Sequence, residues 1–104
     1  MKTILPTLKE RNRYLVYEIK NSSHNFNEIK NEIKKAMLQF LGEFEYAKAN
    51  ILILDDFKEN KGIIKANNKY IDKVKVALML IRNFTVETKY VSGTLKKARF
   101  KLGG

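Results

Sequence analysis

The order of hydrophobic patterns along the chain constrains its fold more than any other feature. Two stretches carry apolar residues at helical spacing, and each lies between stretches rich in β-branched and aromatic residues. The 104 residues are enough for one hydrophobic core and too few for two. We therefore expect a single domain, residues 1–104, with the order strand–helix–strand–strand–helix–strand.

The first helix is the most clearly marked element. Asn25 and Glu28 match a capping box at its start, and Gly42 stands where a glycine commonly ends a helix. Between them, apolar residues recur at helical spacing: Phe26, Ile29, Ile33, Met37 and Phe40. Strands are predicted at residues 13–19, 47–54, 62–66 and 85–92, with a turn from Asp55 to Gly62.

The second helix, from Asn67 or Asn68 to about Arg82, is apolar beyond one stripe. Val76 and Met79 lie outside the arc that would face a sheet. A helix with a second apolar surface usually buries it in the core or against a partner. Val76 and Met79 are therefore predicted to contact a partner protein, with completion of the core as the alternative.

This element order is that of the ferredoxin-like, or RRM-like, fold, an α+β arrangement with an antiparallel sheet and both helices on one face. The first and last strands are neighbours in that topology. The start of the first strand therefore lies beside the end of the last. Domains of this type can bind RNA through aromatic residues in the first and third strands. Here the third strand has none, and Tyr14 and Tyr17 of the first are expected to face opposite ways.

Positive charge concentrates at the two chain ends. The chain carries 21 Lys and Arg against 11 acidic residues, a net charge of +10. Residues 1–20 account for +3 and residues 85–104 for +4, so we expect a basic N-terminal arm and a basic C-terminal tail. Since the topology brings both ends together, they should form one phosphate-binding patch. Its predicted members are Lys9, Arg11, Arg13, Lys96, Lys97 and Arg99.

Catalytic residues are scarce. Cysteine is absent, which excludes disulfides and thiolate chemistry and suits a reducing compartment. The single histidine, His24, lies beside Ser22 and Ser23 in a polar loop without an evident orienting acid. Asp55 and Asp56 could bind Mg²⁺, although consecutive acids at a strand end are more often solvated. We expect no catalytic or metal site, no membrane span or signal peptide, and a cytoplasmic location.

Three stretches in the expected order resemble protein component 2 of archaeal ribonuclease P, the counterpart of a small subunit shared by eukaryotic ribonuclease P and MRP. They are MKTILPTLKERNRYL, ALMLIRNF and VSGTLKKARFK. The family opens on Leu-Pro-Pro-Thr-Leu, basic residues and Arg-Tyr, and it has a late Ser-Gly-Thr motif. Leu5 stands where the first of those prolines is usual. The matching positions are Pro6, Thr7, Leu8, Arg13, Tyr14, Ser92, Gly93, Thr94, Lys97 and Ala98.

The resemblance implies a non-catalytic subunit that binds ribonuclease P RNA and acts with a TIM-barrel-like partner, protein component 3. The RNA and its Mg²⁺ would remove the 5′ leader from precursor tRNA, so the protein would meet that substrate indirectly and need no cofactor. Family members can form a heterotetramer in which two copies of this subunit meet, and the sequence leaves self-association open. The alternatives are a ferredoxin-like interaction or regulatory domain, and a metal-dependent nuclease using Asp55 and Asp56.

Overall fold

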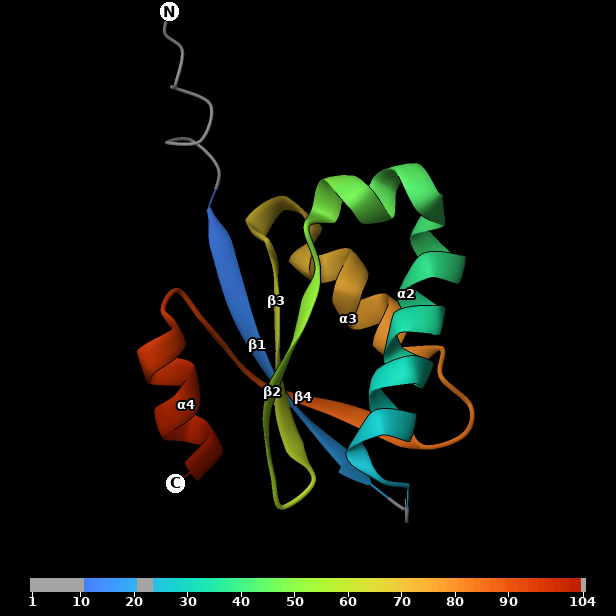
Figure 1. Ribbon diagram of the computed structural model, residues 1–104. Coiled ribbons are helices and arrows are strands. Elements are labelled where there is room, and N and C mark those ends of the chain that lie inside the picture. The colour runs from blue at the N-terminus through green and yellow to red at the C-terminus, as the bar shows by residue number, and fades with distance from the viewer. Residues whose placement is uncertain (1–10, 21–23, 104) are drawn as a thin grey trace, which may run out of the picture.

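The computed structural model describes residues 11–20 and 24–103 and confirms the ferredoxin-like fold (Figure 1). Four strands form one antiparallel sheet in the order β2-β3-β1-β4. Helices α2 and α3 cover one face, as predicted, and a further helix, α4, lies on the other. The elements are β1 (Asn12–Lys20), α2 (Phe26–Ala49), β2 (Leu52–Lys58), β3 (Lys61–Asn67), the 3₁₀ turn η1 (Asn68–Tyr70), α3 (Ile71–Met79), β4 (Thr85–Ser92) and α4 (Leu95–Gly103).

Helix α2 begins at the predicted capping box. The backbone N–H of Glu28 donates to Asn25 Oδ1 over 2.9 Å, and the backbone N–H of Asn25 donates to Glu28 Oε1 over 3.1 Å. Ile29, Ile33 and Met37 are fully buried, as their spacing predicts. The helical conformation is interrupted at Gly42, where φ is 80°, a value that favours glycine.

The predicted strand at 47–54 is wrong in its first half. After the kink at Gly42 the chain resumes a helical path to Ala49, and β2 begins only at Leu52. Alanine and lysine favour this helical continuation. Asn50 then ends it in the left-handed conformation, with φ 55° and ψ 44°, and its N–H donates to the carbonyl of Ala47.

The predicted turn at 55–62 is also too long. Strand β2 continues through Lys58, and Lys58 pairs with Lys61, so the hairpin has a two-residue loop. Both loop residues, Glu59 and Asn60, have positive φ (51° and 65°), as a loop of type I′ requires. Helix α3 likewise ends at Met79, earlier than the predicted Arg82.

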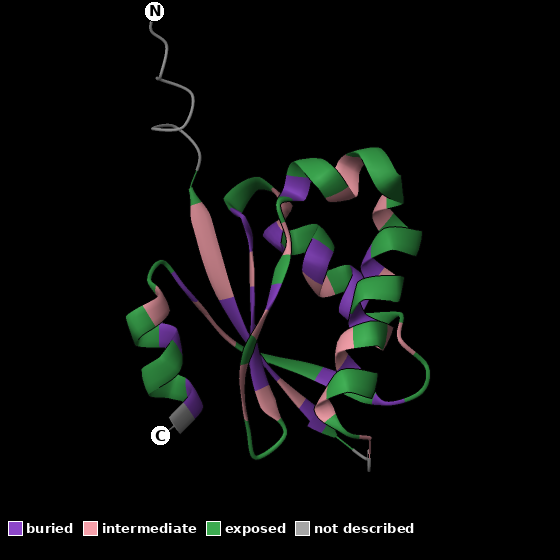
Figure 2. Ribbon diagram, viewed as in Figure 1, coloured by how far each residue is buried: buried purple, intermediate pink, exposed green. Residues whose placement is uncertain are grey.

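Two buried clusters hold the layers together, one on each face of the sheet (Figure 2). The larger one joins α2 and α3 to the sheet through Leu15, Tyr17, Ile33 and Val74, among others. The smaller one joins α4 to the sheet and comprises Val16, Ile63, Ala98 and Leu102. Among the described helices, none combines the length and apolar character needed to cross a membrane.

Candidate nucleic-acid interface

The Ser-Gly-Thr motif turns the chain from β4 into α4. The Ser92 hydroxyl is buried, donates to the carbonyl of Thr94 over 2.8 Å and accepts from the N–H of Thr94 over 3.1 Å. Thr94 in turn caps the helix, because its hydroxyl accepts from the N–H of Lys97 over 3.3 Å. Gly93 sits in this turn, and a side chain there would meet only the guanidinium of Arg13, at 3.5 Å.

The basic C-terminal segment is a helix packed on the sheet, so its prediction as a tail is wrong. Ala98 and Leu102 are buried against Val16 and Ile63, and Leu95 packs against the same cluster. These three positions of α4 follow at intervals of three and four residues, which is the spacing of one helical face. Helix α4 contacts all four strands. It therefore covers part of the face on which RRM-type domains stack bases.

The topology brings the start of β1 and the turn into α4 to one end of the sheet. Tyr14 pairs with Ser92, and the Arg13 guanidinium lies beside Gly93, at the turn into α4. The backbone carbonyl of Arg11 accepts a hydrogen bond from Asn68 N–H over 2.7 Å, which fixes the start of β1. Lys9 lies outside the described residues. Since side chains alternate along a strand and Tyr14 packs toward α4, Arg13 leaves the sheet from the opposite face.

Lys96 and Lys97 are exposed on the first turn of α4. We call Arg11, Arg13, Lys96 and Lys97 the basic rim, since they surround one end of the sheet. The remaining predicted contact, Arg99, is exposed but ion-paired: its Nε donates to Asp56 Oδ2 over 2.9 Å, and Nη2 approaches Oδ1 at 3.5 Å. Its charge is therefore partly neutralised before any ligand arrives.

Asp55 and Asp56 point to opposite faces of the sheet. Asp56 pairs with Arg99 of α4, whereas Asp55 lies 3.7 Å from Lys30 Nζ of α2. The two carboxylates therefore cannot share one ion, as the nuclease alternative requires. Within residues 11–20 and 24–103, no group of three or more His, Cys, Asp or Glu side chains could hold a metal. His24 packs edge-on against Phe84, with 5.5 Å between ring centroids, and Ser22 and Ser23 lie outside the described residues.

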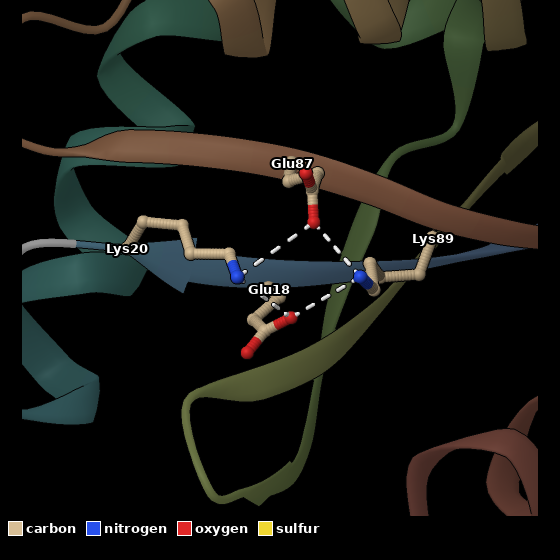
Figure 3. Close-up of polar contacts among 4 residues, drawn as sticks. All are labelled: Glu18, Lys20, Glu87 and Lys89. Carbon is tan, nitrogen blue, oxygen red and sulfur yellow. Dashed lines mark hydrogen bonds and ion pairs between the residues drawn. The ribbon is translucent and has the colours of Figure 1, made fainter.

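The part of the sheet that α4 leaves open carries a closed set of ion pairs (Figure 3). Glu18 and Glu87 face each other across β1 and β4, and Lys20 and Lys89 bridge them. Lys89 Nζ lies 2.8 Å from Glu87 and 3.5 Å from Glu18, and Lys20 Nζ lies 3.9 Å and 3.6 Å from the same two carboxylates. The four charges cancel. This region therefore contributes little to the electrostatic attraction of a polyanion.

Two basic residues near α4 were not among the predicted contacts. Lys65 pairs with Tyr14 across β1 and β3, so it stands on the α4 face of the sheet. Lys101 Nζ lies 5.0 Å from the centre of the Tyr90 ring. The register between β1 and β3, which places Lys65 on this face, could not be predicted from the sequence. As predicted, Tyr14 and Tyr17 face opposite ways: Tyr17 lies in the larger cluster, and Tyr14 packs toward α4.

The two predicted partner-contact residues lie at the surface of α3. Val76 is 43% exposed and Met79 is 74% exposed, so the alternative that they complete the core is wrong. Leu80, next in the chain, lines a shallow pocket with Ala36, Gln39 and Phe40 of α2. An exposed apolar surface therefore extends from α3 to α2. This surface lies across the sheet from α4.

Comparison with known proteins gives one consistent family. The model described as the Rpp14/Pop5 family matches residues 13–102. A relative from Methanocaldococcus jannaschii, named Ribonuclease P protein component 2, is 36% identical over 100% of this chain and 81% of its own length. Relatives of the same name from Pyrococcus abyssi and Pyrococcus horikoshii are each 34% identical over 97% of this chain, and the matches cover 92% and 90% of their own lengths.

The match begins one residue inside β1 and ends one residue before the end of α4, so it reaches every strand and helix described above. It therefore includes the Ser-Gly-Thr turn and the basic helix that follows it, and it confirms the resemblance expected from the sequence. This chain belongs to the Rpp14/Pop5 family.

Proposed function

We propose that this chain is a protein subunit of ribonuclease P that binds and stabilises the catalytic RNA during removal of the 5′ leader from precursor tRNA. Its archaeal relatives carry the name Ribonuclease P protein component 2. The observation that carries the RNA-binding part is the basic rim. The start of β1, with Arg11 and Arg13, meets the turn into α4 at one end of the sheet, and α4 contains no acidic residue.

Phosphates are the ligands that suit such a surface. Exposed Lys and Arg side chains bind the RNA backbone and release its counterions. Base stacking on the sheet in the manner of RRM domains is disfavoured, because α4 and the ion pairs of Glu18 and Glu87 occupy that face. We therefore assign Arg11, Arg13, Lys96 and Lys97 to phosphate contacts, with Lys9 and Arg99 as further members.

The protein's part in the reaction is to shape the RNA. Asp55 and Asp56 diverge, and each is paired with a cation, so we assign hydrolysis to the RNA and its Mg²⁺. The exposed apolar surface around Val76 and Met79 is our proposed contact for a second protein subunit. Protein component 3, with a TIM-barrel-like fold, is the partner that the family resemblance implies.

Reconstituted cleavage tests this function. Precursor tRNA is incubated with ribonuclease P RNA and the partner subunit at moderate Mg²⁺, with and without this chain, and a further reaction contains this chain alone. We expect cleavage at the mature 5′ end only when all three components are present. If a chain that is folded and bound to the partner changes nothing, the proposal fails. Cleavage by the chain alone would restore the nuclease alternative.

A further inference from the structure

An exposed aromatic ring stands on the outer surface of α4. Phe100 is 76% exposed, although phenylalanine is among the residues most often buried. It lies midway between Ala98 and Leu102, which are buried, and two residues correspond to about 200° of helical rotation. The ring therefore points away from the sheet and contributes nothing to the core.

Cations surround this ring. Lys96 and Lys97 precede Phe100 by four and three residues, so all three share one helical face. Side chains in a helix lean toward its N-terminus, which brings the ring over the turn that carries both lysines. Together with Arg99 they line one shallow hollow. Arg99 itself is drawn aside to Asp56, which leaves the face of the ring open.

The two lysines stand where they oppose helix formation. The N-terminal turn of a helix carries partial positive charge, and cations there are unfavourable. Within the described part of the chain, no acidic side chain pairs with Lys96 or Lys97, and α4 contains no acid. An anionic ligand would relieve both the mutual repulsion of the lysines and their repulsion by the helix end.

We infer that Phe100 is a stacking platform for an unpaired base of bound RNA, with Lys96 and Lys97 holding the adjacent phosphates. This rests on the proposed RNA-binding function and adds a base-contacting subsite to it. A nucleotide offers a flat π face and a phosphate in one ligand, which matches both halves of the hollow. A protein ligand could match this hollow only with an apolar surface surrounded by acidic side chains.

Phe44 provides a matched control. It is 72% exposed, close to Phe100, and Lys48 Nζ lies 4.9 Å from its ring centre. However, its neighbours in the chain are Glu43 and Glu45, and it belongs to α2, across the sheet from α4. It thus shares the exposed ring and a nearby lysine with Phe100, but its surroundings repel phosphate.

Tryptophan fluorescence gives the first test, because the chain has no tryptophan of its own. Phe100→Trp and Phe44→Trp are each titrated with a short single-stranded RNA and with an abasic oligonucleotide of the same length. We expect the base-containing RNA to quench only the tryptophan at position 100, and the abasic strand to quench neither. Equal quenching by both strands, or at both positions, would overturn the stacking site.

Affinity gives the second test. The unmodified chain should bind the base-containing strand about tenfold more tightly than the abasic strand. Phe100→Ala should remove that preference and Phe100→Tyr should keep it, with unchanged circular dichroism because the ring is exposed. A preference that persists in Phe100→Ala overturns the inference. Equal binding of both strands by the unmodified chain overturns stacking while leaving RNA binding intact, whereas no binding to either overturns both.

The same tryptophan distinguishes a protein ligand. If its emission shifts to shorter wavelength as the concentration of Phe100→Trp rises without RNA, position 100 is buried between two copies of the chain. That result would overturn the stacking site.

Discussion

At the scale of single residues, Tyr17 and Gly62 place the tightest demand on the core. They pair directly across β1 and β3, and Tyr17 is fully buried. A Cβ on Gly62 would overlap the ring and hydroxyl of Tyr17. Glycine at this position is thus needed for space, and its φ is not in the left-handed region.

Gly62→Ala should therefore destabilise the fold. Displacing a buried aromatic ring in a packed core costs about 1–3 kcal/mol, and we expect the free energy of unfolding to fall by that amount in urea denaturation. Gly93→Ala is the matched control, since its Cβ would make only an ordinary contact with Arg13. A Gly62→Ala variant as stable as Gly93→Ala would show that Tyr17 can move aside at no cost.

Tyr17→Phe should instead stabilise the fold. The Tyr17 hydroxyl is buried and finds no hydrogen-bond partner in the described part of the chain. Burial also raises the pKa of Tyr17, so the hydroxyl stays protonated. Removing an unsatisfied buried hydroxyl should raise the free energy of unfolding by about 1 kcal/mol in the same urea titration. A less stable variant would reveal a partner for this hydroxyl, such as a bound water.

At the scale of elements, the pairing of β1 with β4 depends on charge. Glu18 and Glu87 stand directly opposite each other, an arrangement that is unfavourable without Lys20 and Lys89 between them. The hydrogen bond and the charge of Lys89, followed by the charge of Lys20, lower the pKa of Glu87 below its ordinary value of 4.5. In return, Glu87 and then Glu18 raise the pKa of Lys89 above 10.5.

These shifts fix the sign of a pH dependence. Because the pKa of Glu87 is lower in the folded state, its stabilising contribution is present above pH 4.5 and disappears as the pH falls through the lowered pKa. We expect Glu87→Gln to unfold more easily than the unmodified chain at neutral pH and equally easily in strong acid. Thermal unfolding across this range is the measurement. A difference that persists in strong acid would have to arise from packing.

The elements that the sequence predicted correctly are those with strong local signals. The start of α2 combines a capping box with Ile29 and Ile33 at helical spacing, and tertiary contacts reinforce both. The sequence does not predict helix α4, because only Leu95, Ala98 and Leu102 mark its buried face among four basic residues. A helix this short gains its stability from packing on the sheet, which the local sequence does not show.

The same contrast between local signals and tertiary packing applies to the candidate site. The position of the start of β1 beside the end of β4 could be predicted, because the order of strands in a ferredoxin-like sheet makes these two strands neighbours. The pairing of Arg99 with Asp56 could not, because 43 residues separate them in the sequence and only the packing of α4 brings them together. A cation that is already paired with a carboxylate attracts an anionic ligand less strongly. A count of charges along the sequence therefore overstates how much Arg99 contributes to phosphate binding.

At the scale of the whole molecule, the distribution of the +10 charge determines how RNA binding should respond to salt. The ion pairs of Glu18 and Glu87 cancel on the open part of the sheet, and the basic rim does not cancel. If about five phosphates are neutralised, affinity for ribonuclease P RNA should fall by about three to four decades for each tenfold rise in salt. A regulatory domain whose basic residues form no RNA-binding patch would bind RNA weakly and without regard to its structure.

The double variant Arg11→Ala/Lys97→Ala tests the basic rim itself. It should reduce the salt dependence by about one to two units in a plot of log affinity against log salt, because each lost phosphate contact removes about one unit. Lys34→Ala/Lys73→Ala removes the same charge from α2 and α3, across the sheet from α4, and should leave the slope unchanged. If both variants reduce the slope equally, only the net charge of the chain matters. If Arg11→Ala/Lys97→Ala leaves the slope unchanged, the RNA contact lies away from this end of the sheet.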